Sequence, residues 1–216
     1  MAELRVFISS TCYDLAVVRE QLRGFLSSLG YQPIMSDYSD VLYDPRVHTH
    51  TSCLLEVTNT DVLIVIVGSR FGGTGVPEAM KHVDFENLRT TSSSQWVIDH
   101  AERLSVTQLE VLRAIEENIP IFAFVEDQVW HDHLVYERNK DILKDIVFHR
   151  SKRRNLQVTS SNLLTFCVCA FEVIRFSVLC VSKILPCTCV SSGPVSFSVF
   201  STSSGISNRL PERWHN

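Results

Sequence analysis

The segment DVLIVIVG, residues 61–68, places six apolar residues in a row between an aspartate and a glycine. Five of the six are Val or Ile, which favour extended backbone. A strand whose side chains are all apolar must be covered on both faces, as the central strand of a parallel sheet is. The segment therefore predicts a central strand with helices packed above and below it.

Further strand and helix patterns alternate along the chain on both sides of this segment. Strands are predicted at 5–9, 31–35 and 121–125. Apolar residues recur at helical spacing between them and predict helices at 15–29, 52–58 and 106–115, with a charged helix at about 128–150. The polar region 81–100 allows a short helix or an ordered insertion. The alternation predicts an α/β fold with an open, doubly wound parallel sheet of four to five strands.

The size and charge of the chain limit its organisation. With 216 residues, of which 45% are hydrophobic, it can form one main domain, predicted at residues 1–150. A formal charge of −4 gives no positive field to attract nucleic acid. The first residues, MAELRVFISS, lack the basic flank and apolar core of a secretory signal, so the predicted location is cytoplasmic.

Seven cysteines are present, and five of them crowd into residues 167–189. Only Cys12 and Cys53 fall in the first 155 residues, and two isolated cysteines make no disulfide framework. Both are predicted to be buried free thiols in a reducing compartment.

The composition changes after Asn155. Residues 156–216 hold six charged side chains, against 38 in the first 155 residues, and are rich in Ser, Cys, Val and Phe. We expect this tail to be unstructured, or to be a stretch that is not evolved protein sequence. A membrane-inserting segment at 162–181 is the less favoured alternative. Glu172 and Arg175 near its middle each cost roughly 2.5–3.5 kcal/mol on insertion scales, so a membrane is not among the expected partners.

Three hydroxyl residues, Ser9, Ser10 and Thr11, lie where the first strand ends. In one interpretation Thr11 and Asp14 form the pattern [ST]-x-x-[DE], which caps a helix. In the other, the hydroxyls bind a ligand, because ligands of open parallel sheets bind beyond the carboxyl ends of the strands, where helix N-termini attract anions. A capped helix can still offer other amides to a phosphate, so both interpretations stay open.

Glycines and an arginine, in GSRFGG at residues 68–73, follow the central strand at the same edge. Gly68 and Gly72 allow a ligand to approach the backbone, or simply allow a tight turn. Arg70 can pair with a phosphate or carboxylate of a ligand, or it can tie the loop to a neighbouring aspartate. The segment has neither the Walker pattern nor the dinucleotide fingerprint G-x-G-x-x-G.

Glu110, in SVTQLE at 105–110, is the candidate catalytic residue. Its carboxylate is expected near the N-terminus of a helix at the same edge of the sheet. There it can bind ribose hydroxyls or stabilise the oxocarbenium ion that develops as an N-glycosidic bond breaks. Ser105 with Gln108, or Thr107 with Glu110, also matches a capping box, so Glu110 has a purely structural alternative.

No metal site and no cofactor is predicted. The histidines of HTHTSC, 48–53, and of HDH, 131–133, are spaced too loosely for zinc and complete no four-ligand set. NAD or another nucleotide enters only as a substrate.

The segment FISSTCYDLAVVRE, 7–20, joins a first strand ending in FISST to a Tyr-Asp-Leu and an Arg-Glu pair. It is followed by SLGYQPIM, VLYDP, TSCLLEV, DVLIVIVGSRFG and SVTQLEVLRAIEENIPIFAFV. Together, over about residues 3–126, these segments resemble a family of TIR-like N-terminal domains of unknown function. Such domains look like relatives of the TIR, flavodoxin and nucleoside deoxyribosyltransferase folds.

The resemblance implies a module of intracellular signalling or defence, and a fragment of a larger protein, since such domains often precede NACHT-type or other STAND NTPases with WD or tetratricopeptide repeats. By position, Glu110 resembles the glutamate that TIR NADases and deoxyribosyltransferases use on the N-glycosidic bond. Two functions follow. The favoured one is a signalling, effector or protein-interaction module that binds protein partners or itself. The alternative is a nucleotide N-glycosidase or deoxyribosyltransferase-like enzyme acting on NAD or nucleosides through Glu110, with Ser9, Ser10, Thr11 and Arg70 holding phosphates and ribose.

Overall fold

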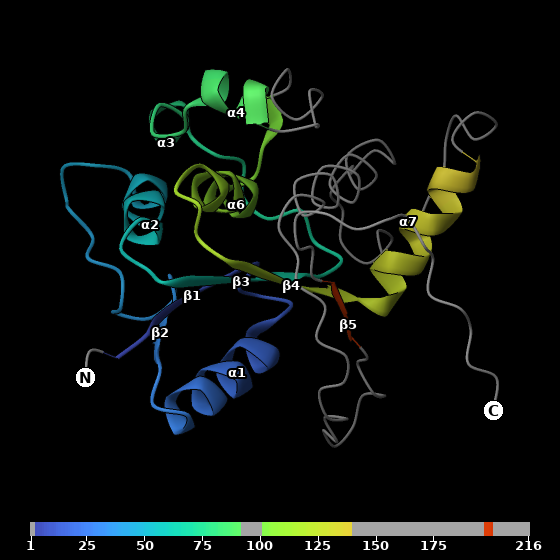
Figure 1. Cartoon of the computed structure of the whole chain (residues 1–216), viewed down its shortest axis with the longest axis horizontal. Helices are drawn as coiled ribbons and strands as arrows, with labels where there is room; N and C mark the ends of the chain where they lie inside the picture. The colour runs from blue at the N-terminus through green and yellow to red at the C-terminus, as the bar shows by residue number, and fades with distance from the viewer. Residues whose placement is uncertain (1–2, 92–100, 140–196, 201–216) are drawn as a thin grey trace.

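The computed structural model describes residues 3–91, 101–139 and 197–200 of the chain. Its parallel strands are β1 (Arg5–Ser10), β2 (Gln32–Ile34), β3 (Val62–Val67) and β4 (Ile121–Glu126). They pair in the order β2-β1-β3-β4, and every one of these pairs is parallel. The prediction of an open parallel sheet in an α/β domain is confirmed, with β3 between β1 and β4 (Figure 1).

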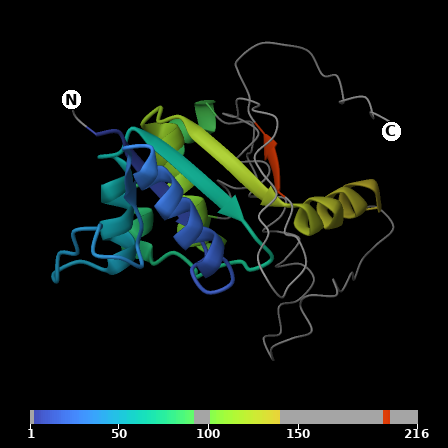
Figure 2. The same ribbon diagram turned by 90° about the horizontal axis from the view of Figure 1, so that it is seen from below.

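Helices cover both faces of the sheet. They are α1 (Ala16–Ser28), α2 (Thr49–Val57), α3 (Pro77–Met80), α4 (Phe85–Thr91), α6 (Val106–Glu116) and α7 (Asp127–Asn139). A short 3-10 helix, Ala101–Arg103, precedes α6. α1 lies on one face, whereas α2 and α6 lie side by side on the other (Figure 1, Figure 2). This is the doubly wound arrangement that the alternation of strands and helices predicts.

Each face of the sheet has its own apolar core. The core on the α1 side contains Val6, Ile8, Leu15, Leu26, Met35, Ile64 and Ile66. The core on the α2 and α6 side is larger and includes Phe7, Leu54, Leu63, Val65, Leu109 and Leu112. Successive residues of β3 enter the two cores alternately, which explains why the strand is apolar at every position.

The helix boundaries differ from the predicted ones mainly at α2. This helix begins at Thr49 rather than at 52, because His48 caps it: ring Nδ1 accepts from the amide of His50 at 3.1 Å. α1 ends before Gly30 as predicted, and Gly30 has a φ of 80°, a conformation that favours glycine. α4 occupies part of the polar region 81–100, where a short helix was one of the two expectations.

β5 (Phe197–Phe200) pairs antiparallel with β4 and adds a fifth strand at that edge of the sheet. The sequence analysis names no strand in this tail, so β5 is an antiparallel addition to the predicted parallel sheet. Four residues of Phe, Ser and Val form too short a run to stand out within a tail rich in the same residues. The rest of 156–216, including the alternative of a membrane segment at 162–181, lies outside the described residues. Within the described ranges, no helix has the length and apolar character needed to cross a membrane.

Candidate functional site

The candidate site lies where the order of the strands reverses. From β1 the chain crosses to β2 on one side, whereas β3 and β4 follow on the other, so the switch point falls between β1 and β3. In open α/β sheets, ligands bind at this point, in the crevice beyond the carboxyl ends of the strands. Two loops border it, residues 11–15 after β1 and residues 68–76 after β3. We call them the first and the second switch-point loop.

Ser9 and Ser10 end β1 and face opposite sides of the sheet, because successive side chains of a strand alternate. Ser9 faces α6, where its hydroxyl donates to Oε2 of Glu110 at 2.5 Å. Ser10 faces α1, where its hydroxyl accepts from Nη1 of Arg19 at 2.7 Å. Of the two serines predicted to share one edge, only Ser9 therefore meets Glu110.

Glu110 lies in the second turn of α6 and takes no part in its cap. The amide of Gln108 donates to Oγ of Ser105, and the amide of Ser105 donates to Oε1 of Gln108, which together form the capping box. The alternative pair, Thr107 with Glu110, is not the one that forms. Glu110 is 5% exposed, and Oε1 has no hydrogen bond from any residue that the structure describes.

The environment of Glu110 changes its acidity. Burial raises the pKa of its carboxyl to about 7, because the ionised form is poorly solvated there. The hydrogen bond from Ser9 and the positive charge of Arg19 act in the opposite direction without cancelling this effect. A carboxyl group with a pKa near neutrality can change its charge at physiological pH, and such groups cluster at functional sites.

Arg19 supports the site from the α1 side and is a residue that the predicted site omits. Its guanidinium donates to the carbonyl of Ile8, to Ser10 and to both carboxylate oxygens of Asp37. Its side chain is 1% exposed. The signal for such a role is its spacing of four from Leu15, which puts a charged residue on the buried stripe of the helix, where it needs buried partners.

Arg19→Met is expected to cost more stability than Arg23→Met, one turn further along α1. Arg19 is 1% exposed and Arg23 is 27% exposed, and each pairs with an aspartate, Asp37 and Asp40 respectively. Loss of Arg19 leaves the buried hydroxyl of Ser10 without its donor and should lower the free energy of unfolding by about 2 kcal/mol. At Arg23, water replaces more of the lost contacts, so the cost is smaller. Chemical denaturation compares the two; equal losses would contradict the buried network.

Thr11 and Asp14 bond to each other instead of capping α1. Oγ1 of Thr11 donates to Oδ1 of Asp14 at 2.6 Å. α1 begins at Ala16, with Leu15 at its N-cap and no side-chain hydrogen bond to the cap. The predicted capping pattern is therefore wrong, because the helix starts too far along the chain for Thr11 to serve as its N-cap. The pair instead braces the first switch-point loop.

Gly68 and Gly72 bring the two switch-point loops together. A Cβ on Gly68 would lie 3.2 Å from Oδ2 of Asp14, and a Cβ on Gly72 would lie 3.2 Å from Cγ2 of Thr11. Gly72 also has a φ of 81°, which favours glycine. In this structure the close approach that these glycines permit is between one loop and the other.

Arg70 lies on the second switch-point loop and Tyr13 on the first. The guanidinium carbon of Arg70 is 5.5 Å from the centroid of the Tyr13 ring. No ion pair between Arg70 and an aspartate occurs among residues 3–91, 101–139 and 197–200, so the expected tie to a neighbouring aspartate does not form there. Tyr13 is 87% exposed. It belongs to the Tyr-Asp-Leu of the segment 7–20, but it is not among the predicted site residues.

Cys53 and Tyr43 lie near the carboxylate of Glu110. Burial, together with the charge of Glu110, raises the pKa of the Cys53 thiol to about 12, so the thiol stays protonated and is a poor nucleophile. The hydroxyl of Tyr43 lies 4.0 Å from Sγ of Cys53 and donates to the carbonyl of Ser36 at 2.6 Å. Both Cys53 and Cys12 are free, as predicted, although Cys12 is only half-buried.

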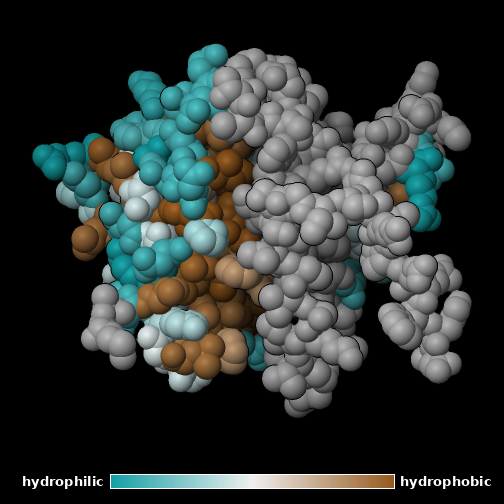
Figure 3. All heavy atoms as spheres, in the orientation of Figure 1, coloured by the Kyte–Doolittle hydropathy of each residue, from teal (hydrophilic) through white to brown (hydrophobic). Residues whose placement is uncertain are grey.

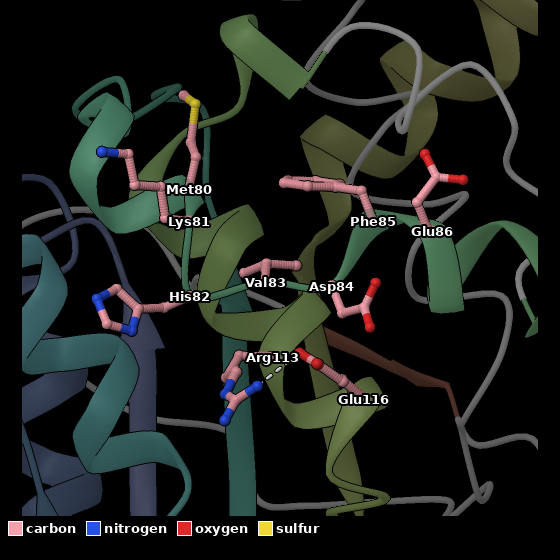
Figure 4. Close-up of a pocket in the computed structure, with 9 residues that line it drawn as sticks. All are labelled: Met80, Lys81, His82, Val83, Asp84, Phe85, Glu86, Arg113 and Glu116. Atoms are coloured by element: carbon pink, nitrogen blue, oxygen red, sulfur yellow. Dashed lines mark hydrogen bonds and ion pairs between the residues drawn. The ribbon is translucent and has the colours of Figure 1, made fainter.

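A separate hollow lies on the outer side of α6, beside the segment 80–86 (Figure 4). Arg113 and Glu116 of α6 line it and form an ion pair at 2.7 Å. Lysine, histidine and acidic side chains of 80–86 also line the hollow. None of the switch-point residues lines the hollow, and its mixed charges select no class of ligand.

The histidines of HTHTSC serve the start of α2. His48 caps the helix, and its ring packs edge to face on that of His50, with centroids 4.3 Å apart. In the part of the chain that the structure describes, no three His, Cys, Asp or Glu side chains are grouped so that they could hold a metal ion.

Comparison with known proteins identifies one family. A family model described as "Domain of unknown function (DUF4062)" matches residues 5–163. The match includes β1 to β4, both switch-point loops and the helices that carry Arg19 and Glu110. No curated protein and no solved structure matches the chain.

Proposed function

Since this chain belongs to the DUF4062 family, which is described as a domain of unknown function, we propose its function from the chemistry of the site, together with the resemblance of the segment 7–20. The chain cleaves the N-glycosidic bond of a nucleotide or nucleoside and passes the sugar to water or to a second base, with Glu110 as the catalytic carboxylate. The observation that carries this proposal is the hydrogen bond between Ser9 and Glu110 at the switch point of the sheet. It holds a carboxyl group of raised pKa where open α/β sheets bind their ligands.

The proposed reaction breaks the bond between the anomeric carbon of the sugar and the nitrogen of the base. The electron pair of this bond leaves with the base, and the sugar becomes an oxocarbenium ion. Nicotinamide leaves NAD as a neutral base, whereas the base of a nucleoside leaves as an anion and takes up a proton from water. Ionised Glu110 stabilises the positive charge through Oε1, while Ser9 holds Oε2 in place. Water, or the nitrogen of a second base, then adds to the anomeric carbon and loses a proton, which completes hydrolysis or transfer.

In this proposal the chain is a TIR-like effector module of intracellular signalling. The support is the segment FISSTCYDLAVVRE, residues 7–20, which resembles that of TIR-like domains, and the position of Glu110 in the second turn of the helix before β4.

The proposal is tested by incubating the full chain with NAD or with deoxynucleosides and measuring free base by chromatography. We expect the unchanged chain to release base and Glu110→Gln to lose this activity. Glu117→Gln, at the end of the same helix and paired with Arg113, is the matched control and should remain active. Absence of base release from all of these substrates by the unchanged chain would overturn the proposal.

A protein-interaction function is the second candidate, and exposed apolar side chains along α1 favour it. Val17 is 61% exposed, Phe25 49% and Leu29 52%. Figure 3 shows hydrophobic side chains gathered below the sheet, where α1 lies, whereas the surface over α3 and α4 is mostly hydrophilic. Apolar side chains gathered on a surface in this way are typical of contact sites between proteins.

Phe25→Glu tests this second function. If α1 forms a contact between copies of the chain, a charge among its exposed apolar side chains should shift the protein toward monomer, as measured by sedimentation velocity. Ser27→Glu adds the same charge at an exposed polar position of the same helix and should leave association unchanged. If the unchanged chain is monomeric at every concentration, self-association through α1 is excluded.

A further inference from the structure

Tyr13 lies on the first switch-point loop and Arg70 on the second. Tyr13 follows Ser9 by four residues, so their Cα atoms are at most about 14 Å apart. The Arg70 guanidinium carbon is 5.5 Å from the Tyr13 ring centroid. Both residues are exposed, Tyr13 to 87%. The pair is therefore open to a ligand and within reach of the site that contains Glu110.

The packing of the fold does not account for this tyrosine. Aromatic rings stabilise proteins mainly through the apolar surface that they bury, and Tyr13 leaves nearly all of its surface in water. Its hydroxyl has no hydrogen bond to any residue in the described ranges. What remains is a flat ring beside a guanidinium, which provides a stacking surface for a base and paired donors for a phosphate.

The loops hold the pair in place relative to the site. Thr11 and Asp14, on either side of Tyr13, are bonded to each other at 2.6 Å. Gly68 and Gly72, on either side of Arg70, pack against Asp14 and Thr11. The backbone next to Tyr13 and Arg70 is thus supported, while the two side chains project outward.

We propose that Tyr13 and Arg70 are the recognition pair of this site, and that its ligand is a nucleotide that carries a phosphate rather than an uncharged nucleoside. The base stacks on the ring of Tyr13, and phosphate oxygens accept from the guanidinium of Arg70. This inference rests on the function proposed above and narrows its substrates to phosphate-bearing nucleotides.

Binding of adenosine and of adenosine 5′-monophosphate tests the pair by isothermal titration calorimetry. The Glu110→Gln chain is used throughout, so that no ligand is consumed. We expect the monophosphate to bind at least about tenfold more tightly, and Arg70→Ala to remove that preference. Tyr13→Ala should weaken both ligands by about 5- to 150-fold, the usual range for one stacked base, and Tyr13→Phe should not. Tyr31→Ala, at an exposed tyrosine outside the site, should have no effect.

Equal binding of the two ligands, no binding of either, or binding that is unchanged in Tyr13→Ala would overturn the inference. Since both side chains are exposed, the variants should fold, and their unfolding temperatures should match that of the parent chain. The result is separable from the proposed function. If the unchanged chain releases no base but nucleotides bind in the expected pattern, the catalytic proposal fails and the recognition pair stands. If base is released from nucleosides and nucleotides with the same KM, the reverse holds.

Discussion

Glu110→Gln is expected to lower kcat for base release by about 10²- to 10³-fold. Glutamine has the same length as glutamate and can still accept the hydrogen bond from Ser9, so the packing of the site is kept. It carries no negative charge, however, and cannot stabilise the oxocarbenium ion. Because that ion develops only as the bond breaks, the loss should fall on kcat and leave KM nearly unchanged.

Ser9→Ala distinguishes the effect of the hydrogen bond that positions the carboxylate from the effect of its negative charge. This variant keeps the charge of Glu110 but removes the hydroxyl that fixes Oε2, so we expect a smaller loss in kcat, roughly tenfold. Steady-state kinetics of the two variants and of the unchanged chain measure the difference. A kcat in Glu110→Gln equal to that of the unchanged chain would show that this carboxylate takes no part in the reaction.

Glu110 is also expected to lower the free energy of unfolding by about 3 kcal/mol between pH 4.5 and pH 7. The pKa of the buried carboxyl is about 7, against an ordinary value of 4.5. Below pH 4.5 it is protonated in both states, and its contribution to stability is fully present. As the pH rises, the unfolded chain ionises first, which lowers its free energy relative to the folded chain. This loss of stability ends when the folded carboxyl ionises as well, at about pH 7.

The Glu110→Gln variant isolates this contribution from those of other groups. His50 acts in the opposite direction, because burial lowers its pKa below 6.5 and makes stability rise with pH in that range. It is present in both proteins and cancels in the comparison. Denaturation at pH 4.5 and pH 8 should therefore show a difference between the two proteins that changes by about 3 kcal/mol. A difference that stays constant with pH would mean that Glu110 ionises as an exposed glutamate does.

The main strands could be predicted because their patterns are local and strong. The six apolar residues of β3 require a covered strand wherever the rest of the chain goes. Strand order then follows from the doubly wound arrangement, and it brings Ser9 and Gly68 to the same edge. The sequence therefore predicts at which edge of the sheet the candidate site lies, but not which side chains contact each other there.

The contacts within the site depend on which helix covers which face. The alternation of side chains along β1 predicts that Ser9 and Ser10 face opposite sides of the sheet. Only the packing of the helices shows that Glu110 contacts Ser9 on one side and Arg19 contacts Ser10 on the other. The capping pattern of Thr11 and Asp14 misled because the same two side chains can bond to each other.

The remaining contacts of the site depend on the loops. Loop sequences have no regular spacing of apolar residues from which a structure can be predicted. The approach of Arg70 to Tyr13 depends on the path of residues 68–76, and the position of Tyr43 depends on the turns between β2 and α2. The exposure of Tyr13 likewise follows from the late start of α1 at Ala16, which leaves the tyrosine in a loop. No single-residue pattern carries this information.

The pH dependence of kcat/KM for base release, measured between pH 5 and pH 9 on the full chain, tests the role of Glu110 most directly. This profile reports the ionisation of the free enzyme. Because the ionised carboxylate is the active form, kcat/KM should rise about tenfold per pH unit at low pH and level off near pH 7, the pKa of Glu110. A profile that is flat or falls across this range would contradict a catalytic carboxylate at the switch point.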